Sequence, residues 1–305
     1  MEMKKKKIIY SLTKRGLFSE LSNLALAIVY AEYNNEELVV NTRNWNARVV
    51  KGWNDYFDSA LTESQCLMCS QYVTFTKKKP WWGNIYYHPS VFFRYYVFYI
   101  MNRLYLLFHP ETELGDDVFL KMRSKDFVEK HGDMKSGYSS ILKKILLFNQ
   151  QTVNYIRIHK AKLNLPDDYM AVHVRRGDKI VSCEMKEIAL SSYIEAIKSK
   201  KHISRNVFIA TDDISVIEEI KTVLTADGFH VYSNNAVRQT GFHESSFNAK
   251  SKETRYIDTL NMLLDMDIMI HSAFFIGTYT SNVSRIVPLY IGFENSLSLD
   301  EDWKL

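Results

Sequence analysis

The stretch YMAVHVRRGDK at residues 169–179 decides the fold of the second half of the chain. Its first six residues are mostly apolar, which predicts a buried β-strand, and the charged residues after them predict a loop. Further apolar runs follow at 206–211, 229–233 and 273–278, and helical patterns lie between them. Strands that alternate with helices are typical of a doubly wound, Rossmann-like domain, in which ligands bind beyond the carboxyl ends of the strands.

The sequence pattern of the N-terminal half predicts another α/β unit. Strands are expected at 8–12 and 37–41, and the apolar residues between them recur at helical spacing, which makes a βαβ unit and favours an open parallel sheet. A long helix is expected over 145–165, where Pro166 ends it. The predicted domains are an N-terminal α/β domain at 1–165 and a Rossmann-like domain at 166–305.

Composition excludes several classes of protein. Of the 305 residues, 46% are hydrophobic and only 11 are Gly and 5 Pro, so the chain can bury a core and is neither disordered nor collagen-like. The formal net charge of +4 is too mild to indicate nucleic acid, but a basic site for an anionic ligand is compatible with it. Cys66 and Cys69 form a CxxC without a second ligand pair for zinc, so ordinary thiols in a reducing compartment are expected.

No membrane-spanning segment is predicted. The longest apolar stretch, 91–108, contains Arg94, Asn102 and Arg103, which are costly to bury in lipid. The lysines near the N-terminus are not followed by the apolar run of a signal peptide. A soluble, cytoplasmic protein is therefore expected.

Two other segments are candidates for substrate contact. Residues 80–110 are rich in aromatic side chains, which either stack on sugar rings or fill the core of a helical subdomain. The polar stretch 234–255 is long for a plain connection and is either a substrate loop or a surface insertion.

The strongest chemical signal is the charged loop after the strand at 169–174. Arg175 and Arg176 suit a diphosphate, because guanidinium groups pair bidentately with phosphate oxygens. The alternative is a salt-bridge cluster with Asp178 that only orders the loop. No GxxxxGK[ST] or GxGxxG motif lies near these strands, which excludes P-loop ATPases and the usual dehydrogenases. A sugar-nucleotide transferase needs neither motif, since arginines stabilise the departing diphosphate.

Three motifs together resemble a known family. HVRRGDK, VFIATDD at 207–213 and TYTSNVSRI at 278–286 are similar, in order and approximate spacing, to the fucosyltransferases that share an HxRRxD motif, most closely the α1,6-fucosyltransferase and rhizobial Nod-factor group. Residues 15–40 and GWNDYF at 52–57 also look like family segments, whereas the region from about 60 to 145 is unmatched. The resemblance implies a GT-B-like fold and the inverting transfer of L-fucose from GDP-fucose to a glycan hydroxyl, without a cofactor or metal.

The resemblance also implies the donor site. Arg175 and Arg176 match the arginines that hold the β-phosphate, Lys179 would assist the leaving phosphate, and Ser281 and Asn282 match residues that reach the phosphates and the sugar. The next helix, expected to start at Thr280 and Ser281, would add backbone N–H groups, unless Ser281 only caps it. The implied donor-binding residues are His173, Arg175, Arg176, Asp178, Tyr193, Asp212, Asp213, Asp265, Thr280, Ser281 and Asn282.

His173 and Asp265 match positions that contact guanine. A carboxylate at Asp265 accepts from the N1–H and the exocyclic amine of guanine, a pairing that adenine lacks. Asp258, Asn261 and Asp265 also form a polar helical stripe, so simple solvent exposure is the alternative. Asp213 has two compatible roles, in the site and as the N-cap of the helix after it.

The general base is assigned to Glu184. In the family a Glu lies four residues after the motif's lysine, whereas Glu184 lies five after Lys179, which implies a one-residue insertion. The separation from Glu184 to Tyr193 agrees with the family and supports the insertion. Glu187 is a rival, and a plain surface Glu is the third possibility.

Asp265-Met266-Asp267 spells the D-x-D pattern that holds a divalent metal in other glycosyltransferases. Such pairs usually lie in a loop after a strand, but this one lies in a helical stretch. No metal is therefore expected.

Other functions stay open at this point. Gly177 is closer to the α1,2-fucosyltransferases, although TSNVSR resembles the α1,6 type. A non-catalytic GDP-sugar or glycan-binding relative is the alternative outside enzymes, supported by the shifted Glu184. Nucleic-acid binding through the basic runs rests on charge alone. The chain is expected to be a catalytic unit without the membrane anchor of the animal enzymes, and its sequence names neither the acceptor nor the linkage.

Overall fold

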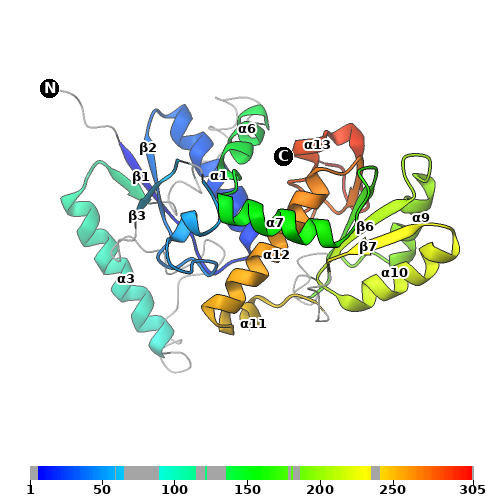
Figure 1. Ribbon diagram of the computed structural model, residues 1–305. Coiled ribbons are helices and arrows are strands. Elements are labelled where there is room, and N and C mark those ends of the chain that lie inside the picture. Colours follow the sequence, from blue (N-terminus) through cyan, green and yellow to red (C-terminus); the bar gives the residue numbers. More distant parts are fainter. Residues whose placement is uncertain are drawn as a thin grey trace. The chain divides into compact units, whose positions relative to one another are not determined.

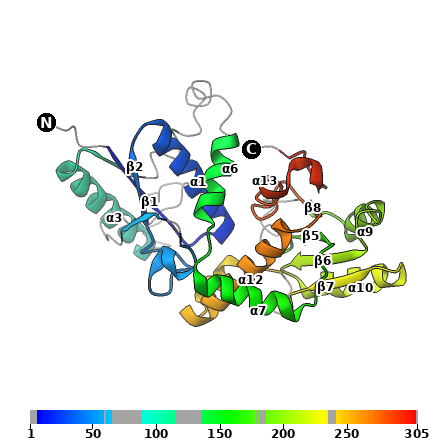
Figure 2. The same cartoon turned by 45° about the horizontal axis from the view of Figure 1, so that its top comes forward.

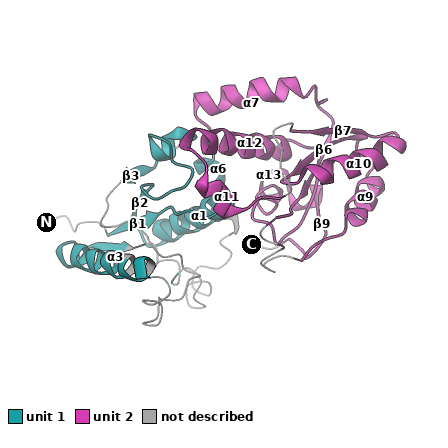
Figure 3. Ribbon diagram, turned by 90° about the horizontal axis from the view of Figure 1, so that it is seen from below, with its two compact units in different colours: residues 1–147 teal, residues 148–305 magenta. Residues whose placement is uncertain are grey.

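The computed structural model divides the chain into two compact units, residues Met1–Leu147 and Phe148–Leu305 (Figure 3). Both units are α/β. The residues that it describes are 6–58, 60–64, 89–114, 121, 135–177, 180, 186–234 and 241–303.

The first unit contains a four-stranded parallel sheet with the order β3-β2-β1-β4 (Figure 1). The expected strands at 8–12 and 37–41 are present, each within one residue. The helix between them buries Leu21, Leu24 and Ala25, which have the spacing of one helical face. The elements are β1 (Lys7–Ser11), α1 (Leu17–Tyr33), β2 (Glu37–Asn41), η1 (Gly52–Asp55), β3 (Thr62–Ser64), α3 (Pro89–Phe108), β4 (Thr112–Leu114) and α6 (Lys135–Ile145).

Helix α3 covers most of the aromatic-rich region. Phe92 is buried, but Phe93, Leu107 and Phe108 are 60%, 75% and 80% exposed. A helix is therefore present over 89–108, and of the two alternatives for its side chains, filling a core does not apply to the exposed ones. Residues 65–88, with Cys66 and Cys69, lie outside the described part. Among the described residues, no helix is long and apolar enough to cross a membrane.

The second unit contains a five-stranded parallel sheet with the order β7-β6-β5-β8-β9, of which Figure 2 labels β7, β6, β5 and β8. All four apolar runs predicted as strands are strands, which confirms the Rossmann-like domain. The strands are β5 (Met170–Val174), β6 (Asn206–Thr211), β7 (His230–Ser233), β8 (Phe274–Gly277) and β9 (Ser296–Ser298). The helices are α7 (Gln150–Lys162), α9 (Leu190–Ser199), α10 (Ile214–Ala226), α11 (Glu244–Ala249), α12 (Lys252–Ile270), α13 (Pro288–Ile291) and the 3₁₀ turn η2 (Phe293–Asn295).

Alternate residues of β5 define the two faces of this sheet, because successive side chains of a strand point to opposite sides. Met170, Val172 and Val174 pack in one core with the apolar faces of α9 and α10. His173 lies between them in sequence, so it belongs to the other face, where α12 packs.

The boundary between the units differs from the predicted one. The helix expected over 145–165 is α7, which is shorter at both ends: α6 ends at Ile145, and the Asn149 side chain caps α7 by accepting the Thr152 N–H at 2.9 Å. Helix α7 then packs along α12 (Figure 3). The second unit therefore begins after Leu147 and not after Leu165.

Candidate functional site

The predicted site lies at the switch point of the second sheet. The chain leaves the central strand β5 towards β6 and β7, and later returns to the other side of β5 as β8 and β9 (Figure 2). In open α/β sheets, ligands bind beyond the carboxyl ends of the two strands where the order reverses, here β5 and β8. Arg175 and Arg176 follow β5, and the segment 278–286 follows β8, so the topology brings these two motifs to one place.

Arg175 is held at the carboxyl end of β5 by Asp212, which follows β6. Its Nη1 lies 2.8 Å from Asp212 Oδ2, and the side chain is 17% exposed. Its guanidinium also lies over the ring of Phe242, 5.1 Å from the centroid, in a cation–π contact.

Arg176 turns towards the segment before α9. Its Nη1 and Nη2 both donate to the Ile188 carbonyl at 3.1 Å, and Nη1 lies 3.2 Å from Glu187 Oε1. The Glu187 side chain is 61% exposed, so this ion pair is screened by water and is worth only about 0.2–1 kcal/mol. Glu187, the rival base, thus lies beside Arg176.

Asp212 joins three segments through one carboxylate. Besides the Arg175 side chain, it accepts the Arg176 N–H at 2.8 Å and the Phe242 N–H at 2.9 Å. Its carbonyl accepts the Gly241 N–H at 3.0 Å. Asp212 orients the arginine loop, residues 175–177, and the loop at 241–242; its predicted contact with the donor stays a prediction. Asp213 caps α10 by accepting the Ser215 N–H at 2.9 Å.

Two glycines allow these loops to touch. Gly177 has φ +77° and Gly241 has φ +86°, which non-glycine residues rarely adopt. A Cβ on Gly241 would lie 2.6 Å from the Gly177 Cα, and a Cβ on Gly177 would lie 2.4 Å from the Phe242 carbonyl oxygen. Residues 241–242 of the polar stretch 234–255 are therefore packed on the arginine loop.

His173 is buried and neutral. Burial, and secondarily the charge of Arg175, lowers its pKa to about 3. Its Nδ1 lies 2.8 Å from Ser284 Oγ, which links β5 to the segment after β8. Tyr193 of α9 is buried as well, close to Arg176 and Thr278, and burial raises the pKa of its hydroxyl far above the ordinary value.

The segment after β8 is a series of turns. The prediction that a helix starts at Thr280 and Ser281 is wrong, since the next helix, α13, begins at Pro288. Thr280 donates its N–H and hydroxyl to Asp300, the Ser281 N–H donates to the Thr278 carbonyl, and the Asn282 side chain accepts from Arg285. The first N–H groups of this segment are thus bonded within the protein.

Asp265 lies half-buried on α12 in a polar cluster. Its Oδ1 accepts from Asn234 Nδ2 at 3.2 Å, and Asn234, at the end of β7, also reaches Asn261. Burial raises the pKa of Asp265 to about 7, although the hydrogen bond from Asn234 acts in the opposite direction. Simple solvent exposure of Asp265 is therefore wrong.

The two carboxylates of the D-x-D pattern have different surroundings. Asp267 pairs with Lys160 and His271, each at 3.5 Å, whereas Asp265 contacts Asn234. Residues two apart on a helix do not face each other, which explains this divergence. No cluster of three potential metal ligands occurs among the described residues.

Three predicted site residues, Asp178, Lys179 and Glu184, lie outside the described residues. Conversely, sequence reasoning missed Phe242, Asn234 and Asp300. Only Asp300 offered a local signal, as an acidic residue directly after a short β-like pattern, and nothing in the sequence indicated its partners.

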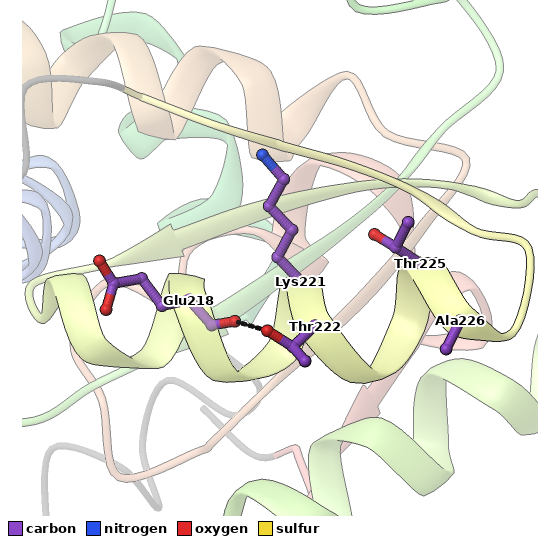
Figure 4. Close-up of a pocket in the computed structure, with 5 residues that line it drawn as sticks. All are labelled: Glu218, Lys221, Thr222, Thr225 and Ala226. Atoms are coloured by element: carbon purple, nitrogen blue, oxygen red, sulfur yellow. Dashed lines mark hydrogen bonds between the residues drawn. The ribbon is translucent and has the colours of Figure 1, made fainter.

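A shallow hollow on α10 does not belong to this site (Figure 4). It is lined by exposed side chains of that one helix: Glu218, Lys221, Thr222, Thr225 and Ala226. Helix α10 starts at the carboxyl end of β6 and runs back, so these residues lie towards the opposite edge of the sheet.

Two units with parallel sheets, and a pair of arginines at the switch point of the second, agree with the GT-B-like glycosyltransferase fold that the sequence led us to expect. The chain belongs to the family of alpha-(1,6)-fucosyltransferase N- and catalytic domains, whose model matches residues 3–291. It is accordingly a fucosyltransferase.

Solved structures support the fold. The crystal structure of NodZ alpha-1,6-fucosyltransferase soaked with GDP-fucose is 18% identical, with a TM-score of 0.57 over 94% of this chain and 93% of that one. NodZ from Bradyrhizobium has the same identity and score over 95% and 94%. POFUT1 in complex with GDP is 12% identical, with a TM-score of 0.54 over the whole of both chains. Among curated protein sequences, none matches the chain.

Proposed function

We propose that the protein transfers L-fucose from GDP-fucose to a hydroxyl of a glycan acceptor with inversion, in the manner of the α1,6-fucosyltransferases. The observation that carries this proposal is the placement of Arg175 and Arg176 at the carboxyl end of β5, opposite the TSNVSR segment after β8. Family membership and the GDP-fucose and GDP named for NodZ and POFUT1 point to the same donor.

The arginines would stabilise the diphosphate as it leaves the sugar. Asp212 and Phe242 keep the Arg175 guanidinium in place. Arg176 can exchange its weak contact with the exposed Glu187 for a phosphate, which carries more charge and accepts a bidentate pair. The growing negative charge of GDP then meets preoriented cations, which lowers the barrier to departure.

Asp265 and His173 are proposed to recognise guanine. An ionised Asp265 accepts two N–H groups of guanine, while an adenine base would offer the half-buried carboxylate neither of these two donors. A neutral His173 can donate or accept a hydrogen bond without adding charge.

The acceptor hydroxyl attacks from the face opposite GDP and loses its proton late in the displacement. Glu184 remains the proposed base for that proton. Because Glu187 contacts Arg176, it would serve the donor side of the site and not the acceptor side. The reaction is proposed to need no metal, since Asp265 and Asp267 have separate partners, and excess EDTA should leave the rate unchanged.

Nucleotide binding tests the donor. GDP should raise the unfolding temperature measurably more than ADP or UDP at equal concentration, because a ligand stabilises the state that binds it. Equal shifts for all three nucleotides would contradict guanine recognition.

Turnover tests the reaction. Arg176→Ala should lower fucosyl transfer by at least about a hundredfold, because the departing phosphate loses a bidentate partner. Lys201→Ala, at an exposed lysine before β6, is the control and should retain full activity. Full activity of Arg176→Ala would disprove the assignment.

Two further measurements separate the alternatives. Failure of the wild type to release GDP from GDP-fucose with any acceptor would favour a binding protein. Linkage analysis on an acceptor panel separates α1,6 from α1,2 products.

A further inference from the structure

The short segment after β9 reaches the loop that follows β8. Asp300 Oδ1 accepts the Tyr279 N–H at 2.6 Å, and Oδ2 accepts both the Thr280 N–H at 3.1 Å and the Thr280 hydroxyl at 2.6 Å. Asp300 lies 20 residues beyond Thr280 in the chain. One carboxylate thus fixes two successive peptide groups where the loop leaves the strand.

Asp300 is itself firmly held. Ser298 Oγ and the Glu301 N–H both donate to its Oδ1 at 2.8 Å, and Ser298 Oγ also accepts the Tyr279 N–H at 3.0 Å. Strand β9 pairs with β8, and Trp303 stacks on Phe275 of β8. Burial tends to raise the pKa of Asp300, but the hydrogen bonds from Thr280, Glu301 and Ser298 outweigh it and hold the pKa below the ordinary value. The group is therefore an anion at neutral pH.

The loop that Asp300 holds belongs to the predicted donor site. This loop contains Ser281 and Asn282, and it lies on the β8 side of the switch point. Ser284 of the same loop lies 2.8 Å from His173 Nδ1, so the loop is joined to β5, the strand that the two arginines follow. The family model ends at residue 291, and Asp300 lies beyond it.

We propose that Asp300 is a positioning residue of the donor site, which holds the loop after β8 in the form that presents Ser281 and Asn282 to the diphosphate. The inference rests on the proposed function. Asp300 does not touch the donor: its negative charge is neutralised by the N–H groups of Tyr279 and Thr280, and those groups are in turn withdrawn from phosphate binding.

The test compares Asp300→Asn with Asp302→Asn, which removes the same charge from an exposed neighbour. Calorimetric titration with GDP should show a loss of affinity of about tenfold or more for Asp300→Asn, as expected when charge-assisted hydrogen bonds are lost. The KM for GDP-fucose should rise by a similar factor while the KM for the acceptor stays unchanged. Asp300→Glu, which restores the carboxylate, should recover part of the affinity, and Asp302→Asn should match the wild type.

Several results would overturn the inference. Unchanged GDP affinity in a folded Asp300→Asn variant would do so, and so would increased affinity, which would mean that Asp300 competes with the diphosphate for the same amides. If Asp300→Asn does not fold, Ser298→Ala removes one bond to the carboxylate and one to Tyr279, and unchanged affinity there is equally decisive. A wild type that does not bind GDP would refute the proposed function itself, whereas a wild type that binds GDP leaves Asp300 to be judged by its own variants.

Discussion

Asp265 shows at the level of one residue how function opposes stability. Its pKa of about 7 lies above the ordinary value of an unfolded chain, so between about pH 4 and pH 7 the folded state binds a proton that the unfolded state does not. This contribution to stability is complete at low pH and is lost as the pH rises through 7. The ionised Asp265 that guanine binding requires is thus the form that makes the ligand-free protein less stable.

Two opposite pH effects follow for Asp265. GDP affinity should fall by up to about tenfold for each pH unit below 7, because a protonated carboxyl cannot accept both guanine N–H groups. The free Asp265→Asn variant should unfold at a higher temperature than the wild type at pH 8, while it binds GDP weakly. Calorimetry and thermal unfolding from pH 5.5 to 8.5 measure both effects. Any pH dependence of GDP affinity that remains in Asp265→Asn is due to ionisation of the phosphate. If the GDP affinity of the wild type has the same pH dependence as that of the variant, Asp265 does not have this role.

At the scale of elements, the contact between the loop after β5 and the loop before α11 can be tested through its glycines. Gly241→Ala should lose about 1–2 kcal/mol from the left-handed backbone alone, and more from the contact with Gly177. It should also weaken GDP binding, because Phe242 then shifts from Arg175. Thermal unfolding and GDP titration measure these losses.

Gly228→Ala is the matched control. Gly228 has φ +76° in the turn before β7, but its added Cβ would meet only the flexible end of Arg205. It should cost similar backbone strain without any change in GDP affinity. If both variants bind GDP like the wild type, the loop contact does not support the donor site.

The elements that were predictable from sequence are those with long apolar runs. Strands β5, β6, β7 and β8 satisfy this condition, whereas β9 has the sequence SLS and the strands β3 and β4 are equally short and polar. The break before α7 had a signal in Asn149, but the apolar residues on both sides resemble one continuous helix. Asp212 was found by its motif, yet its role as a clamp depends on Phe242, thirty residues later, and no local pattern encodes such a contact.

At the scale of the molecule, every predicted donor residue belongs to the unit Phe148–Leu305. Hydrogen exchange with and without GDP should therefore show protection concentrated in the segments 170–177, 241–243, 261–267 and 274–286, because binding suppresses the opening of the elements it contacts. Strands β1 and β2 of the first unit should change little. Equal protection of β1 and β2 would contradict a donor site confined to the second unit.

The glycine pair has a consequence for anyone who recombines this enzyme with its relatives. Gly177 and Gly241 touch through bare backbone, so neither loop can be exchanged by itself for a homologous one that carries a side chain at that point. The two loops and Asp212 should therefore be taken together from the same parent enzyme. Chimaeras that keep all three from one parent should fold, and those that bring a side chain to either glycine position should be destabilised.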